Sequence, residues 1–269
     1  MRILIAHNVP GRASGGMTRI MSFLHEGLRQ AGHTIEYLCA EDLPAQWNGS
    51  KARFGFPYLV HRHTSQAARV GKPYDIINVH EPSGALVSWW KSVRRPGRIV
   101  VTSHGIEERG WQIHLAERRK HGASVPIKSR VLYPSTVLWQ ARLALRKADH
   151  VFCLNTQDRN YLIEHLGRKP DSITRIYPGA APVYVPVARN RCYAAATRWL
   201  FAGTWNERKG VRYFSESFTR LAAEHPQVSL CVLGAGVPQD EVRSYFPEAL
   251  RSRVSTVQTT SDEENARVL

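Results

Sequence analysis

Short, continuously apolar runs alternate with amphipathic segments along the chain, and this alternation restricts its possible folds more than any other feature. In the first part the runs occupy residues 2–6, 34–39, 74–79, 98–103, 150–154 and 173–177. Segments with helical spacing lie between them, for example Met17 to Leu28. Strands without polar alternation are typical of a parallel sheet that helices cover on both faces. The sequence therefore predicts an α/β fold with a doubly wound, Rossmann-like sheet.

The same pattern divides the chain into two parts and a connection. Residues 1–180 hold the first strand and helix series and are expected to form a complete N-terminal domain. Prolines and an Ala- and Arg-rich stretch without a period mark 181–197 as a linker. A second series with three expected strands occupies 198–269. Because a three-stranded parallel sheet leaves an unpaired edge, we expect a partial second domain and a C-terminally truncated copy of a longer protein.

Basic residues are concentrated in the first part of the chain. The 269 residues carry a net charge of +15 with histidine neutral, and the first 185 contain 26 basic and 13 acidic side chains. Such a charge favours an anionic partner. None of the familiar nucleic-acid-binding motifs is present, so no nucleic acid is expected. Anionic lipid head groups or a phosphate-bearing acceptor fit the charge equally well.

The cysteines and the N-terminus bear on the location of the protein. The four cysteines lie at least 39 positions apart, so no paired metal-ligand spacing exists and no metal site is expected. The apolar run at the N-terminus is too short for a signal peptide, and no run is long enough to span a membrane. We expect a reduced, cytoplasmic protein, with any membrane contact peripheral and at the inner face.

Two turns that follow expected strands carry residues suited to a ligand, because open parallel sheets bind ligands at the carboxyl ends of their strands. Gly15 and Gly16 precede a helix, where the missing Cβ atoms let backbone N–H groups approach a phosphate. A plain tight turn is the alternative for this pair. His104, within Thr102–Glu107, can donate a hydrogen bond to a sugar hydroxyl or a carbonyl. A structural hydrogen bond is the alternative for this histidine.

Four segments occur in an order that resembles a known enzyme family. They are Pro10–Gly16, Thr102–Gly105, Phe201–Gly210 and Leu233–Gly236. A Gly-Gly loop, Thr-x-His-Gly, Gly-x-x-x-x-Arg-Lys-Gly and Gly-x-Gly in this order are similar to the pattern of the group 1, or family 4, retaining glycosyltransferases of the GT-B type. Those enzymes have two Rossmann-like domains, of which the first binds the acceptor and the second the nucleotide sugar. The resemblance implies sugar transfer with retention of the anomeric configuration.

The resemblance also implies roles for individual residues. His104 would contact the donor sugar as the catalytic residue, and Gly15 and Gly16 would lie against the donor or the acceptor. Further residues would bind the donor; they are Gly203, Arg208, Lys209, Gly234 and Gly236. Fixed positive charge stabilises a leaving diphosphate without a metal. No metal or other cofactor is therefore expected, and the nucleotide sugar is a substrate.

The chain departs from the family pattern at several places. Thr204 stands where many relatives have an arginine, and residues 177–180 are Tyr-Pro-Gly-Ala in place of a Pro-Asn-Gly hinge. The acidic Glu-x7-Glu motif, which holds the donor sugar and ribose, would lie beyond Leu269. This fragment is therefore expected to be inactive alone. A solvated helix N-terminus is the alternative for Arg208 and Lys209, and a plain strand-to-helix turn is the alternative for the later Gly-x-Gly.

A basic segment suggests how an acceptor is presented. Residues 131–148 combine apolar side chains, Trp139 among them, with arginine and lysine, and Arg118-Arg119-Lys120 precedes them. This composition is typical of a surface that lies on an anionic membrane, where it would present a lipid-linked acceptor. A domain helix that packs on the sheet and exposes a solvated basic side is the alternative.

The leading hypothesis is a hexosyltransferase-type glycosyltransferase. It would transfer a sugar from a nucleotide diphosphate donor to a saccharide or lipid-linked acceptor in the assembly of cell-surface polysaccharide. One alternative is a sugar-nucleotide epimerase of the same two-domain build, which would need carboxylates of its own at the reaction site. The other is a non-catalytic remnant that binds nucleotide or an anionic membrane.

Overall fold

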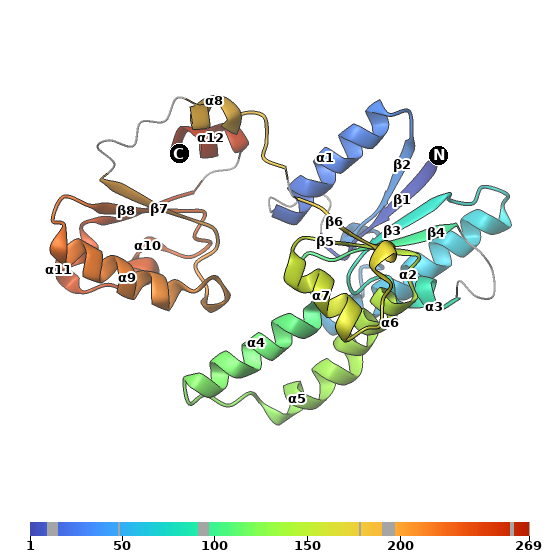
Figure 1. The fold of residues 1–269 in the computed structure, drawn as a ribbon, viewed down its shortest axis with the longest axis horizontal. Coiled ribbons are helices and arrows are strands. Elements are labelled where there is room, and N and C mark those ends of the chain that lie inside the picture. Colours follow the sequence, from blue (N-terminus) through green and yellow to red (C-terminus); the bar gives the residue numbers. More distant parts are fainter. Residues whose placement is uncertain are drawn as a thin grey trace. The chain divides into compact units, whose positions relative to one another are not determined.

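The chain folds into two compact units, Met1–Gly179 and Ala180–Leu269, each built on its own parallel sheet (Figure 1). The computed structural model describes residues 1–9, 16–47, 49–90, 97–177, 179–189, 197–258 and 261–268. The two parallel sheets confirm the predicted α/β class. Each unit is described separately below.

The first unit contains a six-stranded sheet with the order β2-β1-β3-β4-β5-β6. All neighbouring strands are parallel. The strands are β1 (Arg2–Ala6), β2 (Thr34–Leu38), β3 (Ile76–His80), β4 (Arg98–Thr102), β5 (His150–Cys153) and β6 (Ile173–Arg175). The order reverses direction after β2, so the sheet is doubly wound, as the sequence predicts.

Helices connect successive strands of this unit. The α-helices are α1 (Gly16–Gln30), α2 (Gly49–Arg69), α3 (Ala85–Trp90), α4 (Glu107–Lys120), α5 (Ile127–Tyr133), α6 (Trp139–Lys147) and α7 (Thr156–Glu164). Shorter helical turns are η1 (Ala40–Asp42), the π-helical η2 (Pro134–Leu138) and η3 (Pro170–Ser172). Because η2 joins α5 directly to α6, one irregular helix runs from Ile127 to Lys147.

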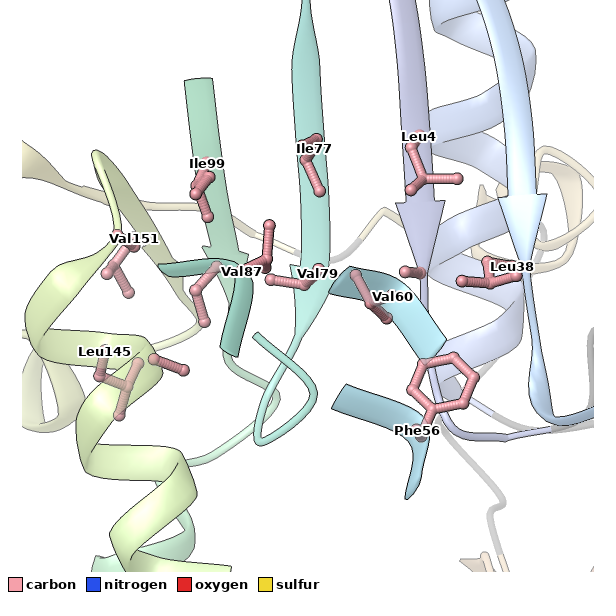
Figure 2. Packing of buried hydrophobic residues seen from close by; sticks show 14 of the residues in the cluster. Leu4, Leu38, Phe56, Val60, Ile77, Val79, Val87, Ile99, Leu145 and Val151 are labelled. Carbon is pink, nitrogen blue, oxygen red and sulfur yellow. The ribbon is translucent and has the colours of Figure 1, made fainter. Parts of the chain in front are cut away.

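Both faces of the first sheet are buried. Ile3 and Ile5 of β1 pack with Met21 of α1 on one face. The opposite face carries the larger core, in which Leu4 and Phe56 are fully buried. Figure 2 shows Leu4, Ile77 and Ile99 side by side on neighbouring strands, as their pairing register requires. Burial on both faces explains why these strands are continuously apolar in the sequence.

The second unit has a three-stranded parallel sheet with the order β7-β8-β9. Its elements are α8 (Tyr184–Arg189), β7 (Arg198–Ala202), η4 (Glu207–Lys209), α9 (Val211–Glu224), β8 (Ser229–Leu233), α10 (Gln239–Arg243), α11 (Glu248–Arg251), β9 (Val254–Val257) and α12 (Asp262–Val268). Trp205, Phe218 and Phe246 form an aromatic centre for its core. This unit therefore has a hydrophobic core of its own.

One expectation about local structure differs from the fold. The sequence pattern predicts a loop over residues 44–57, yet α2 begins at Gly49 and contains Pro57. Phe56 and Val60 lie on one face of this helix and are fully buried, so their burial outweighs the hydrogen bond that Pro57 cannot donate. The residues expected as a linker, 181–197, include the described helix α8, where the Tyr184 hydroxyl donates to Asp262 Oδ1 over 3.0 Å.

Across the described residues, none of the helices combines the length and the apolar composition that a bilayer crossing requires.

Just before β4, the backbone at Gly97 passes close to the backbone at Tyr74. Its φ is +105°, and an added Cβ would lie 2.2 Å from the carbonyl oxygen of Tyr74. We expect Gly97→Ala to lower the free energy of unfolding by on the order of 2–3 kcal/mol, because backbone must move as well as adopt a strained φ. Gly27 lies inside α1 with open space around it, so Gly27→Ala should stabilise by about 0.5–1 kcal/mol. Urea denaturation of both variants measures the difference, and equal effects would contradict this packing.

Candidate functional site

The register of the parallel strands brings three buried side chains into a row at one edge of the first sheet. Ala6 of β1 pairs with Leu38 of β2 and with Val79 of β3, so the residues that follow them are neighbours. Those residues are Cys39, His7 and His80, all less than 9% exposed. His7 Nε2 lies 3.2 Å from Cys39 Sγ. This is the carboxyl edge, where parallel sheets bind ligands.

His104, the predicted catalytic residue, lies against this row. Its Nε2 atom is 2.7 Å from Nδ1 of His80, which makes a hydrogen bond. The two imidazole rings are also stacked, with centroids 4.8 Å apart and an angle of 20° between their planes. The His7 ring lies edge to face against His80, with the ring centroids 5.8 Å apart. The turn after β4 thus adds a half-buried histidine to two buried ones.

The surroundings of these histidines favour their neutral forms. Burial lowers the pKa of His80 well below its ordinary value, and the neighbouring imidazoles of His104 and His7 lower it further. Burial and the nearby His7 likewise lower the pKa of His104, and burial lowers that of His7. Burial raises the pKa of the Cys39 thiol to about 11. At neutral pH the row is therefore an uncharged set of hydrogen-bonding groups.

Glu81 holds the turn that carries His104. The Ser103 hydroxyl donates to Glu81 Oε2 over 2.6 Å, and the backbone N–H of Glu107 donates to Oε1 over 3.1 Å. Burial raises the pKa of this carboxyl to about 8, although both hydrogen bonds oppose the shift. Gly105, directly after His104, has a φ of +128° that favours glycine. Glu81 therefore connects the end of β3 to both sides of the His104 turn.

The predicted glycine pair before α1 is only partly described. Gly15 lies outside the described residues, and Gly16 is the first residue of α1. The described residues before this gap end at Val9, two positions after His7. A helix begins where the sequence predicts one, while the Gly-Gly turn and its contact with donor or acceptor stay predictions.

Glycines shape two adjoining loops in the second unit. The N–H of Gly203 donates to Leu233 O over 2.8 Å, and the N–H of Gly234 donates to Val257 O over 2.9 Å. Both glycines have positive φ, and both N–H groups are occupied by the sheet. They therefore act as turn residues, and their backbone donors do not point at a phosphate. Gly236, also at positive φ, is exposed, and a Cβ on it would lie 3.6 Å from Thr204 Cγ2.

Arg208 and Lys209 lie on the short helix η4 at the same end of the second sheet. Both side chains are exposed, and neither forms an ion pair with another described residue. Their acidic neighbour Glu207 is instead paired with Arg212 over 2.7 Å. Gly210 ends the turn with a φ of +72°. The loops after β7 and β8 thus combine uncompensated positive charge with glycine turns.

The basic segment expected at 131–148 is buried on one side and exposed on the other. Val137, Leu138 and Leu145 are each less than 5% exposed, and they pack within the first unit. Arg142 forms a bidentate ion pair with Glu108. Trp139 is 52% exposed. The buried side agrees with the packed-helix alternative, and contact with a membrane stays a prediction.

Metal ligation has no candidate in the described part of the chain, since its His, Cys, Asp and Glu side chains form no group of three or more that could hold an ion.

Sequence reasoning missed the partners of His104. His7, His80 and Glu81 all stand at or just after expected strands, so their common edge could have been inferred from the strand pattern. The signal was weak because the chain has 12 histidines, and strand order is needed to decide which of them meet. Only the order β1-β3-β4 makes His80 the neighbour of both His7 and His104.

Two Rossmann-like parallel sheets within one chain are the architecture of the GT-B glycosyltransferases. Sucrose-phosphate synthase from Thermosynechococcus elongatus shares the fold with a TM-score of 0.69 at 19% identity, over 98% of this chain and 72% of that protein. HepE from Anabaena, solved in complex with UDP-glucose, has a TM-score of 0.57 at 18% identity, over 97% and 70% of the two chains.

The sequence places the chain more closely. Residues 14–182 match the model of glycosyltransferase family 4, and the chain belongs to this family. The phosphatidyl-myo-inositol mannosyltransferase of Mycolicibacterium smegmatis is 24% identical over 245 residues, which make up 85% of this chain and 57% of that protein. The chain thus spans somewhat more than half of this relative. Both the resemblance and the GT-B fold class are confirmed.

Glu81 makes the stability of the first unit depend on pH. Between its ordinary pKa of 4.5 and the folded value of about 8, the folded state holds a proton that the unfolded state releases. The contribution of Glu81 to the free energy of unfolding is therefore fully present below pH 4.5. It falls as pH rises to 8, by up to ~1.4 kcal/mol per pH unit. Glu81→Gln should flatten this slope in thermal melts, and Glu164→Gln on the exposed face of α7 should not. Identical slopes for Glu81→Gln and the unaltered protein would show that Glu81 is ionised when folded.

Proposed function

We propose that Met1–Gly179 is the acceptor-side unit of a glycosyltransferase and that Ala180–Leu269 binds its donor. The enzyme transfers a sugar, with retention, from a nucleotide diphosphate donor to a saccharide or lipid-linked acceptor. Membership of glycosyltransferase family 4 supports the reaction class. The observation that carries the donor assignment is the pair of exposed cations, Arg208 and Lys209, in the loop after β7; neither forms an ion pair with another described residue.

Lys209, with Arg208, binds the donor diphosphate. Glycosyl transfer leaves negative charge on the diphosphate, and a cation that no carboxylate neutralises stabilises that charge in the transition state. Because Glu207 is engaged by Arg212, it does not cancel the charge of its neighbours. Gly203 and Gly234 hold the loops in positive-φ turns, and Gly236 is the exposed glycine that lets a nucleotide approach. This arrangement uses no metal.

His104 contacts the donor sugar. The sugar becomes positively charged as the diphosphate departs, so a neutral imidazole that donates a hydrogen bond is more suitable there than an imidazolium. The lowered pKa of His104 keeps the ring neutral at physiological pH. Gly15 and Gly16, at the start of α1, lie against the donor or the acceptor.

The acceptor is a saccharide or a lipid-linked molecule, and the enzyme would meet a lipid-linked acceptor at the cytoplasmic face of a membrane, in surface polysaccharide assembly. The mannosyltransferase relative is named for phosphatidyl-myo-inositol, a lipid. Cys39, Cys153 and Cys231 are unpaired and buried, as in a reduced compartment. Helices α4 and α5 expose Ile113, Ile127 and Val131 by 58%, 80% and 60%.

These apolar side chains belong to a surface with the charge that anionic lipids attract. Arg119, Lys128 and Arg130 are exposed on the same two helices. Trp111 of α4 stacks on Tyr133 of α5 at 4.6 Å, so the helices lie together (Figure 1). Apolar insertion and cationic attraction act together in peripheral membrane binding. The proposed membrane surface therefore includes residues of α4 and α5 that precede the basic segment predicted at 131–148.

Titration of the full-length protein with UDP, GDP and ADP sugars tests the donor site. One of these donors should bind, and Lys209→Ala should weaken its affinity about 10- to 100-fold, because a charged hydrogen bond contributes ~1.5–3 kcal/mol. Arg220→Ala, an exposed cation on α9, is the matched control and should leave the affinity unaltered. Unchanged binding by Lys209→Ala, or no binding of any sugar nucleotide, would contradict the proposed site.

Vesicle co-sedimentation tests the membrane surface. The protein should bind vesicles that contain anionic lipid, release them in high salt and bind neutral vesicles weakly. The double change Ile127→Ser and Lys128→Glu should reduce binding, whereas Val70→Ser, which alters another exposed apolar side chain, after α2, should not. Salt-insensitive binding to neutral and anionic vesicles alike would argue against this surface.

A further inference from the structure

His80 both hydrogen-bonds to His104 and stacks on its ring, and the proposed reaction has not yet given it a role. It is 2% exposed. Its Nδ1 lies 2.7 Å from His104 Nε2, and the two rings are stacked. Burying a histidine that has no carboxylate partner among the described residues costs folding free energy, because burial disfavours its charged form and leaves one ring nitrogen without a hydrogen bond. A functional role would explain why this cost is tolerated.

The unused nitrogen of His80 indicates which ring donates. Nε2 of His80 is buried and has no hydrogen-bond partner in the described structure. If Nδ1 of the neutral ring accepted a hydrogen bond, the only proton of His80 would be on Nε2 as an orphaned N–H. If Nδ1 donates, the orphan at Nε2 is a lone pair. Buried unpaired N–H groups are rarer than buried unpaired acceptors, so the second arrangement is favoured.

We propose that His80 is a positioning residue that donates its Nδ1 proton to Nε2 of His104 and thereby holds His104 as the neutral Nδ1–H tautomer. This inference rests on the proposed contact between His104 and the donor sugar. With Nε2 of His104 engaged, Nδ1–H is the ring's remaining donor, and it is the group offered to a sugar oxygen. The tautomer of a histidine is set by the partner of its other nitrogen, as in metal-binding histidines.

The groups around the pair are consistent with a neutral donor. His7, after β1, lies against His80 and disfavours protonation of both His80 and His104. Cys39, after β2, contacts His7 as a thiol. Glu81 is protonated at neutral pH and is bound to Ser103 and to the N–H of Glu107, at the start of α4. The Glu107 carboxylate accepts from the Tyr133 hydroxyl.

Imidazole ¹⁵N NMR of the full-length protein tests the tautomer directly, and it needs no variant. The expected result between pH 6 and 8 is a protonated Nδ1 and an unprotonated Nε2 on His104. An Nε2–H tautomer, or a charged ring, would overturn the inference. In His80→Phe, which keeps an aromatic ring at the buried position, the His104 proton should move in part to Nε2, the commoner position in a free imidazole.

Kinetics of the same variants separate positioning from a structural role. His80→Phe should lower kcat about tenfold and move the acidic limb of its pH profile to higher pH, because Nε2 of His104 becomes free to take a proton. His80→Asn, whose amide can donate from the place of Nδ1, should restore most of the rate and the profile. His63→Phe removes a bond of similar length, 2.8 Å to the Tyr74 hydroxyl, and serves as the control that leaves the profile unchanged.

His104→Ala keeps this test distinct from that of the proposed function. Loss of activity in His104→Ala with an unaltered rate and profile in His80→Phe would overturn the positioning role alone. An active His104→Ala enzyme would overturn the proposed sugar contact, and the NMR result on the unaltered protein would still decide the tautomer.

Discussion

Parallel pairing in register is the constraint on which the rest of this structure depends. Because β1, β3 and β4 run in the same direction and pair residue by residue, their carboxyl ends meet at one edge. That geometry brings together His7, His80 and the His104 turn, which are far apart in the sequence. Pairing in the second sheet does the same for the loops after β7 and β8.

The carboxyl ends of the two sheets differ in charge. In the first unit, buried imidazoles and a protonated carboxyl make a neutral set of hydrogen-bonding groups. In the second, Arg208 and Lys209 are exposed cations that form no ion pair with another described residue. Under the proposed function, such cations suit an anionic leaving diphosphate, and a neutral imidazole does not repel a sugar that becomes positively charged.

Continuous apolar runs and glycine turns were sufficient to predict most of the fold. Strands such as Arg2–Ala6 lie where the sequence predicts them, because a strand buried on both faces must be apolar at nearly every position. The N-terminal turn of α2 was not predictable, because Pro57 and Gly55 favour a loop locally and only tertiary burial of Phe56 overrides them.

The candidate site was predictable only in part. His104 and Lys209 stand in motifs whose spacing is visible in the sequence, but the hydrogen bond to His80 depends on strand order, which spacing does not encode. The sequence motifs that contain Gly203 and Gly234 equally fail to show that the N–H groups of these glycines are occupied.

A crystal structure of the full-length protein with an intact nucleotide sugar, or an unreactive analogue, tests the central claim most directly. The account predicts that the diphosphate lies at hydrogen-bond distance, about 3 Å, from Lys209, and that a sugar oxygen lies as close to Nδ1 of His104. A donor bound with Lys209 in solvent, or with its sugar remote from His104, would contradict it.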